Sequence, residues 1–159
     1  ISAVAHRPDL LLLDEPSSGL DPVVRLDILD AMVRTVADDG RTVLFSSHLL
    51  DEVERMSDSV TMIDRGRVVL DGELDDIKEH HYLIDFNLVE SRSTPPTVES
   101  ALSIEGGGHR WTVLCANAIE QVREALSRIG AEIVNLRNAT LQEIFVARVD
   151  RKSLTLEEV

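Results

Sequence analysis

The first third of the chain alternates between short apolar runs and one long amphipathic segment. Residues 10–13 are four consecutive leucines, which is typical of a central parallel strand buried on both faces. A second apolar run at residues 41–46 predicts another such strand. The intervening segment predicts a helix, and a strand–helix–strand order with short connections implies a parallel sheet.

The helix between these strands has clear start and stop signals. Asp21 is an N-cap residue, and Pro22 suits the first helical position. The helix is expected to run to about Asp38 and to end at Gly40 in a left-handed conformation. Its apolar residues recur at spacings of 3, 4 and 3, which predicts one packed face: Leu26, Leu29, Val33 and Val36.

The remaining pattern predicts a short helix over residues 49–56 and a hairpin of strands at 59–63 and 67–70. Asp71-Gly72 is expected to turn the chain into a helix at 73–79. From residue 80 the pattern is that of a small α+β module. Its expected elements are a strand at 81–89, a hairpin of 100–105 with 110–115, a helix at 118–128 capped by Gly130, a strand at 132–136, and a helix opened by the capping box 140–143.

These elements predict an α/β fold with two domains and a tail, at residues 1–79, 80–150 and 151–159. Residues 1–7 resemble the last turns of a helix that stops before Pro8. Because the chain opens in this way on Ile1, we expect it to be part of a longer protein.

Composition narrows the function classes. The formal charge is -13, with a net of -10 in residues 1–79 and -3 in residues 80–159. So acidic a chain is unsuited to nonspecific nucleic-acid binding, which depends on Lys and Arg neutralising phosphates. No apolar run is long enough to span a membrane, and the single cysteine, Cys115, fits a reducing, cytosolic compartment.

Candidate chemistry lies where the two predicted parallel strands end. Asp14 and Glu15 follow the leucine run, and Ser46-Ser47-His48 follows the second strand. In open α/β sheets the carboxyl ends of the strands form the ligand-binding edge. A core strand that simply emerges into solvent remains the alternative for Asp14 and Glu15 alone.

Three motifs together resemble one family. Asp14-Glu15-Pro16 resembles the Walker B motif of ATP-binding cassette (ABC) ATPases, Ser18-Gly19-Leu20-Asp21 resembles their D-loop, and Ser46-Ser47-His48 resembles their H-loop. The resemblance implies the C-terminal half of a P-loop NTPase domain of the ABC type, followed by a small α+β domain. It implies ATP and Mg²⁺ as cofactors.

The resemblance also implies roles for individual residues. Asp14 would hold Mg²⁺, through water, and Glu15 would be the catalytic carboxylate that activates the attacking water. His48 would contact the γ-phosphate. Ser18, Gly19 and Asp21 would reach a second ATPase subunit across a head-to-tail dimer, and for Asp21 this role is compatible with helix capping.

Other family motifs are absent from the sequence. There is no G-x-x-x-x-G-K-[ST] phosphate-binding loop, and neither a Q-loop nor an LSGGQ-type signature occurs. We therefore expect the chain to be inactive alone. The segment 136–145 resembles the ending of prokaryotic ABC exporter ATPases for drugs, lipids or polysaccharides, with Gln142 where Glu is usual. This implies a membrane permease as partner and a cytoplasmic location, peripheral on the inner face of the cell membrane.

Two other functions remain open from the sequence. One is a non-catalytic dimerisation or regulatory module derived from an ABC ATPase, which would have no chemical need of Asp14, Glu15 and His48. The other is a soluble ABC-type ATPase that moves no solute. Elsewhere, the pair His80-His81 has no third metal ligand at a suitable spacing and is expected at an exposed strand start. The run Gly106-Gly107-Gly108 is expected to be a turn.

Overall fold

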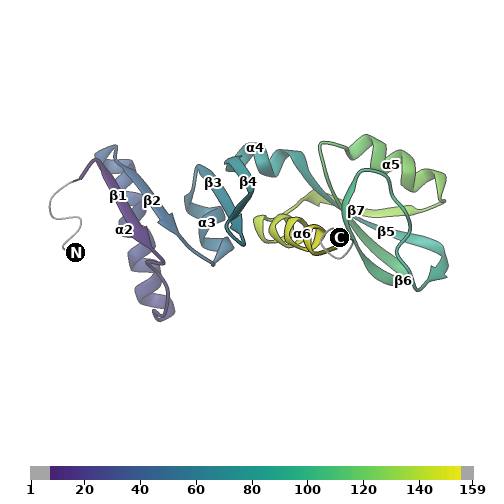
Figure 1. Ribbon diagram of the computed structural model, residues 1–159, viewed down its shortest axis with the longest axis horizontal. Helices are drawn as coiled ribbons and strands as arrows, with labels where there is room; N and C mark the ends of the chain where they lie inside the picture. The colour runs from purple at the N-terminus through teal and green to yellow at the C-terminus, as the bar shows by residue number, and fades with distance from the viewer. Residues whose placement is uncertain (1–7, 155–159) are drawn as a thin grey trace. The chain divides into compact units, whose positions relative to one another are not determined.

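The computed structural model describes the backbone of residues 8–154 and the side chains of residues 8–36 and 40–149. Helices and strands are mixed, so the predicted α/β class is confirmed (Figure 1). The chain divides into two compact units, residues 1–57 and 58–159. The helix end expected at residues 1–7 lies outside the described residues.

The first unit contains the predicted parallel pair of strands. Strand β1 (Leu10–Asp14) pairs with β2 (Thr42–Ser46) in a register that sets Leu10 opposite Thr42 and Asp14 opposite Ser46. Helix α2 (Pro22–Asp39) connects them, and helix α3 (Leu50–Met56) follows β2. Both strands therefore end side by side at the same edge.

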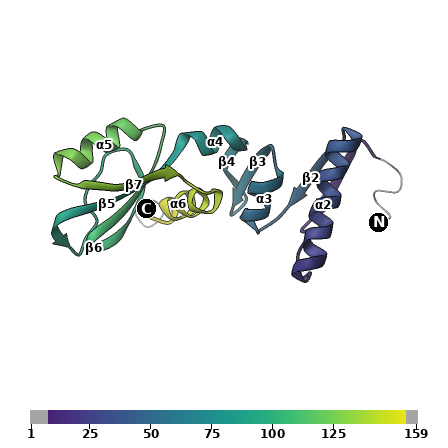
Figure 2. The ribbon, with the colours of Figure 1, turned by 180° about the vertical axis from the view of Figure 1, so that it is seen from behind.

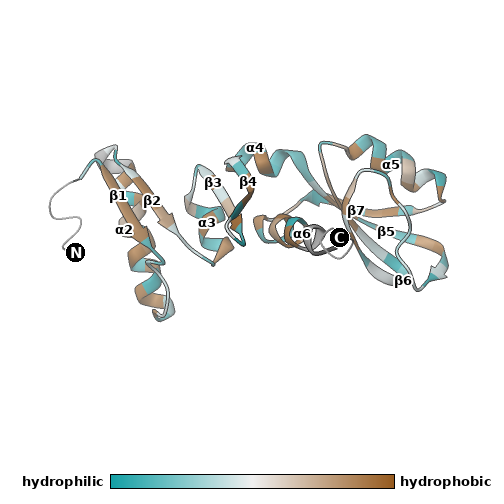
Figure 3. Ribbon diagram, in the orientation of Figure 1, coloured by the Kyte–Doolittle hydropathy of each residue, from teal (hydrophilic) through white to brown (hydrophobic). Residues whose placement is uncertain are grey.

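Within the described part of the chain, one face of this sheet is covered and the other is open. Leu11 is 6% exposed, whereas Leu12 and its neighbour Leu44 are 65% and 63% exposed. Figures 1 and 2, seen from opposite sides, show α2 on one side of the two strands. The prediction that the leucine strand is buried on both faces is thus wrong for this structure, because a single helix covers a two-stranded sheet on one side. Figure 3 shows the hydrophobic character of both strands.

The ends of α2 are as predicted, but its packed face is not. Asp21 Oδ1 accepts from the backbone N–H groups of Val23 and Val24, at 3.0 and 3.2 Å. Gly40 has φ +62° and donates its N–H to the Val36 carbonyl. The expected stripe is largely exposed, at Leu26, Val33 and Val36, while Met32 and Thr35 are buried. The helix carries apolar residues on more than one side, so periodicity alone did not select the side that packs.

The second unit begins with an antiparallel hairpin and continues into a three-stranded antiparallel sheet of order β6–β5–β7. Its elements are β3 (Ser59–Asp64), β4 (Arg67–Glu73), α4 (Leu74–His80), β5 (His81–Arg92), β6 (Ala101–Ala116), α5 (Ile119–Arg128), β7 (Glu132–Asn138) and α6 (Leu141–Leu154). The hairpin of β3 with β4 confirms the expected turn at residues 64–66.

Three boundaries differ from the sequence prediction. Asp71 and Gly72 remain within β4, because they pair with Thr61 and Val60 across the hairpin. Helix α6 continues to Leu154, past the expected start of the tail. Residues 101–116 are continuous as one element, β6, and the backbone folds back at the glycine run, where Gly106 approaches Arg110 and Trp111.

The sheet of the second unit is packed on both faces. On one face, Ile84, Phe86 and Val113 pack with Val122 and Leu126 of α5. On the other, Leu83 and Leu114 pack with Ile77 of α4 and Ile144 of α6. Helix α4 therefore shares a core with the C-terminal sheet, whereas the sequence grouped it with residues 1–79; the domain boundary at 79/80 remains a prediction.

His81 differs from the expected exposed strand start, because it is buried between α4 and α6. Its Nδ1 lies 2.6 Å from the Ile77 carbonyl and its Nε2 lies 3.0 Å from Arg148 Nη2. His80 is exposed. Among the described residues, no helix is both long and apolar enough to cross a membrane.

Candidate active site

The predicted site residues of the first unit meet at the carboxyl ends of β1 and β2. The Glu15 backbone N–H donates to the Ser46 carbonyl at 3.2 Å and to Ser46 Oγ at 2.9 Å. Ser46 Oγ in turn donates to Asp14 Oδ1 at 2.5 Å. Parallel pairing in this register is what brings residues 14 and 46 together, 32 positions apart in sequence.

Glu15 and His48 are in direct contact. His48 Nδ1 lies 2.7 Å from Glu15 Oε2, and both side chains reach solvent. A carboxylate only accepts hydrogen bonds, so Nδ1 carries the proton and donates it. The second carboxylate oxygen, Oε1, and the second ring nitrogen, Nε2, are not used in this contact. The sequence predicted both residues, and the fold brings them together.

Glu15 has an unusual backbone conformation. Its φ is +46°, in the left-handed region that residues other than glycine, asparagine and aspartate seldom adopt. Such a conformation costs about 1 kcal/mol or more and persists only where the surroundings hold it. The turn after β1 is therefore held in place by contacts outside itself.

The predicted D-loop residues lie in that turn. Ser18 and Gly19 are exposed, and Gly19 has φ +71°. The Ser18 N–H donates to the Glu15 carbonyl at 3.1 Å. Asp21 serves as the N-cap of α2, so this part of its expected role is confirmed.

A buried polar cluster beneath the turn was missed by the sequence reasoning. Ser17 Oγ donates to Glu52 Oε2 at 2.6 Å, and Arg25 Nε lies 3.4 Å from Glu52 Oε1. The Ser17 and Glu52 residues are 1% and 3% exposed. Glu52 belongs to an acidic stretch with Asp51 and Glu54, so no local signal in the sequence distinguished it.

The side chains at the strand ends fit a divalent cation that takes few protein ligands. Asp14 is an exposed carboxylate, and no group of three or more His, Cys, Asp or Glu side chains suited to hold a metal occurs within the described residues. Mg²⁺ keeps most of its waters and takes one or two carboxylates, so a single Asp suffices. The sequence provides no phosphate-binding loop to accompany it.

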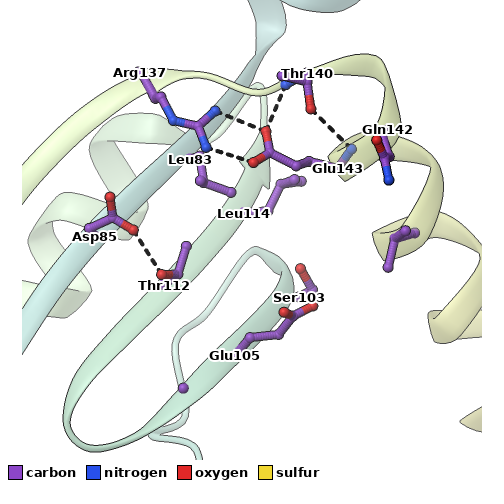
Figure 4. A pocket seen from close by; sticks show the side chains of 12 residues that line it. Leu83, Asp85, Ser103, Glu105, Thr112, Leu114, Arg137, Thr140, Gln142 and Glu143 are labelled. Atoms are coloured by element: carbon purple, nitrogen blue, oxygen red, sulfur yellow. Dashed lines mark hydrogen bonds and ion pairs between the residues drawn. The ribbon is translucent and has the colours of Figure 1, made fainter. Parts of the chain in front are cut away.

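The second unit contains a pocket of about 770 Å³ between its sheet and α6 (Figure 4). Two of its carboxylates, Asp85 and Glu143, already have partners. Asp85 accepts from Thr112 and Asn135, and Glu143 accepts two hydrogen bonds from Arg137, at 2.6 and 2.9 Å. The Arg137 guanidinium holds the pKa of the Glu143 carboxyl down to about 2. These paired groups therefore stabilise the second unit.

The names of known proteins with similar sequences point to the same family that the motifs resemble. No family model matches the chain. It is 30% identical over 158 residues to the ABC transporter ATP-binding protein YtrB of Bacillus subtilis, covering 96% of this chain and 52% of that protein. It is 42% identical over 161 residues to the daunorubicin/doxorubicin resistance ATP-binding protein DrrA of Streptomyces peucetius, covering 92% and 48%.

Over most of its length the chain is similar to ABC transporter ATP-binding proteins. A third relative, the daunorubicin resistance ATP-binding protein DrrA3 of Streptomyces coeruleorubidus, is 31% identical over 156 residues, covering 91% of this chain and 49% of that protein. The chain spans about half the length of these curated relatives. In this family context, the edge formed by Asp14, Glu15 and His48 is the candidate active site.

Proposed function

We propose that the chain provides the metal-binding, water-activating and γ-phosphate-contacting residues of an ATP-hydrolysing subunit of an ABC transporter. The observation that carries this proposal is the 2.7 Å contact of Glu15 with His48, directly beside Asp14 at the ends of two parallel strands. These three side chains come from two strand ends that are more than 30 residues apart.

Each residue has a distinct part in the proposed reaction. Asp14 would hold Mg²⁺, which when bound would supply positive charge to neutralise the phosphates. Glu15 accepts the proton of the attacking water at Oε1, since Oε2 already accepts from His48. Nε2 of His48 then faces the γ-phosphate. Since the phosphate is anionic and only accepts hydrogen bonds, Nε2 donates to it when it carries a proton in addition to the proton on Nδ1.

The partners follow from the same proposal. Exposed Ser18 and Gly19, with Asp21 at the start of α2, contact a second ATPase subunit in a head-to-tail dimer. The dimer works with a transmembrane permease, on the cytoplasmic face of the membrane, and without nucleic acid. Export of a drug, lipid or polysaccharide is supported by two relatives whose names include drug resistance.

Residues 1–159 alone are proposed to be inactive, because their sequence lacks the loop that cradles the β- and γ-phosphates. Magnesium-dependent hydrolysis by this chain by itself, abolished in Glu15→Gln, would contradict that. The coding region upstream of codon 1 provides a direct check: a phosphate-binding loop and a signature motif in frame are expected.

The decisive variant is Glu15→Gln in the complete gene product. Removing the base should lower the hydrolysis rate by about 10² to 10⁴, while ATP affinity stays nearly unchanged. Asp27→Asn, an exposed carboxylate on α2, is the matched control and should retain the rate. A Glu15→Gln rate within a few-fold of wild type would favour the non-catalytic module instead. Co-purification with a polytopic membrane protein separates a transporter subunit from a soluble ATPase.

A further inference from the structure

Among the side chains that the structure describes in the first unit, Glu52 is the buried acidic one. It lies on α3, four positions after His48, yet it is 3% exposed. A buried carboxylate loses hydration worth several kcal/mol, and it is tolerated only when it is paired. Glu52 Oε2 accepts from Ser17 Oγ at 2.6 Å, and Glu52 Oε1 lies 3.4 Å from Arg25 Nε.

These partners connect three segments that surround the candidate active site. Ser17 lies two residues after Glu15, in the turn that follows β1. Arg25 lies in the first turns of α2, and Glu52 lies in the helix that follows His48. One carboxylate therefore joins the segment carrying Glu15 to the segment carrying His48, on the inner side of the turn.

The turn needs such a support. Glu15 adopts φ +46°, and Gly19 adopts φ +71°, so the backbone is held in left-handed conformations at both ends of Ser17. Ser17 is 1% exposed, and its hydroxyl donates to a charged acceptor, which makes this hydrogen bond stronger than a neutral one. Relaxation of the turn would move the Glu15 carboxylate away from His48.

We infer that Glu52, through Ser17 and Arg25, is a positioning residue that holds the Glu15 carboxylate against His48. The part of this inference that is tested by the rate of ATP hydrolysis rests on the proposed function. Glu52 touches none of the reacting groups, so its effect is on geometry: loss of the link should lower kcat and leave KM for ATP nearly unchanged.

The test compares Ser17→Ala, Glu52→Gln and the double variant in the complete gene product. Ser17→Ala removes the donor, and Glu52→Gln keeps the size of the side chain but removes its charge. Each should lower kcat about tenfold, with KM changed less than about twofold. The double variant should be no more than about twofold worse than the worse single variant, because both changes weaken the same link between Ser17 and Glu52. Asp51→Asn, the exposed neighbour on α3, is the matched control and should keep wild-type kcat.

A second readout requires no activity. In folded protein the ¹H–¹³C signal of His48 Cε1 should shift in Ser17→Ala and Glu52→Gln, and it should stay in place in Asp51→Asn. A purely structural Glu52 would lower the Tm without moving this signal or kcat.

The two proposals fail in different ways. If the complete gene product shows no ATP hydrolysis that Glu15→Gln abolishes, the proposed function is wrong. The NMR signal of His48 then decides the role of Glu52. Hydrolysis with an unchanged kcat and an unchanged His48 signal in both variants overturns the positioning role alone. If Glu52→Gln fails to fold, Ser17→Ala gives the same readouts.

Discussion

His81 shows how burial changes the chemistry of a single side chain. Removal from solvent lowers the pKa of His81, although the hydrogen bond to the Ile77 carbonyl acts in the opposite direction, and the nearby charge of Arg148 lowers it further. The two contacts also fix its neutral form. Nδ1 donates to the Ile77 carbonyl, and Nε2 accepts from Arg148 Nη2, which an imidazolium could not do.

This arrangement predicts a loss of stability on acidification. Below the ordinary histidine pKa of 6.5, the unfolded chain takes up a proton that folded His81 does not, so the free energy of unfolding falls as the pH drops below that value. His81→Gln should show less of this pH dependence between pH 7.5 and 5.5 in thermal melts. At pH 7.5 it should cost about 1 kcal/mol for the disturbed hydrogen bonds. The exposed His80→Gln should retain the wild-type slope, and an equal slope in all three proteins would refute this explanation.

At the level of elements, the beginning of α6 is fixed by a reciprocal cap and an ion pair. The Thr140 N–H donates to Glu143 Oε2 at 2.8 Å, and the Glu143 N–H donates to Thr140 Oγ1 at 3.3 Å. This is the capping box predicted from the sequence. Arg137, which donates two hydrogen bonds to the Glu143 carboxylate, belongs to β7, so this ion pair became apparent only in the folded structure.

Glu143→Gln should therefore destabilise the second unit in a pH-dependent manner. The folded pKa of Glu143 is lowered from 4.5 to about 2, so its stabilisation is full above pH 4.5 and is lost as the pH falls toward 2. Since Arg137 and Glu143 are 42% and 32% exposed, solvent screening limits the contribution to about 1 kcal/mol. Denaturant titrations should give this difference at pH 6 and almost none at pH 2. Glu124→Gln, in the surface pair with Arg128, should change stability by less than half as much.

The glycine run of β6 predicts a sharp contrast between neighbours. A Cβ on Gly106 would lie 2.4 Å from the Arg110 carbonyl oxygen, at φ +139°, whereas a Cβ on Gly107 would meet nothing within 4 Å. Gly106→Ala should therefore cost more than about 2 kcal/mol of unfolding free energy. Gly107→Ala should be nearly neutral, and equal Tm values for the two variants would contradict this backbone geometry.

At the scale of the whole molecule, the first unit leaves hydrophobic surface uncovered. Leu10, Leu12 and Leu44 are exposed on one face of a two-stranded sheet. Contiguous apolar surface and open strand edges favour association with other chains.

The chain is accordingly expected to be poorly soluble and to self-associate at micromolar concentration. Leu12→Lys combined with Leu44→Lys should remove most of the associated fraction in sedimentation velocity while leaving the Tm within a few degrees, because neither side chain is buried. Val89→Lys, which alters an exposed valine of the second unit, is the control and should leave association unchanged. A wild-type chain that sediments as a monomer and melts cooperatively would contradict this expectation.

The sequence by itself determined the elements whose signals are local. The four leucines, the Asp21-Pro22 helix start, Gly40, and the Thr140–Glu143 capping box all act through neighbouring residues, and each was confirmed in place. The family motifs likewise led to Asp14, Glu15 and His48, which the fold brings together at the ends of β1 and β2.

The tertiary structure alone decided which faces pack and which charges are buried. The outward stripe of α2, the open face of β1 and β2, and the burial of His81 depend on how many strands and helices surround each element. Glu52 is the clearest case: in sequence it stands beside the acidic residues Asp51 and Glu54, and only the approach of Ser17 and Arg25 makes it a buried, paired carboxylate. Burial and pairing are set by contacts distant in sequence, so no local pattern could have supplied them.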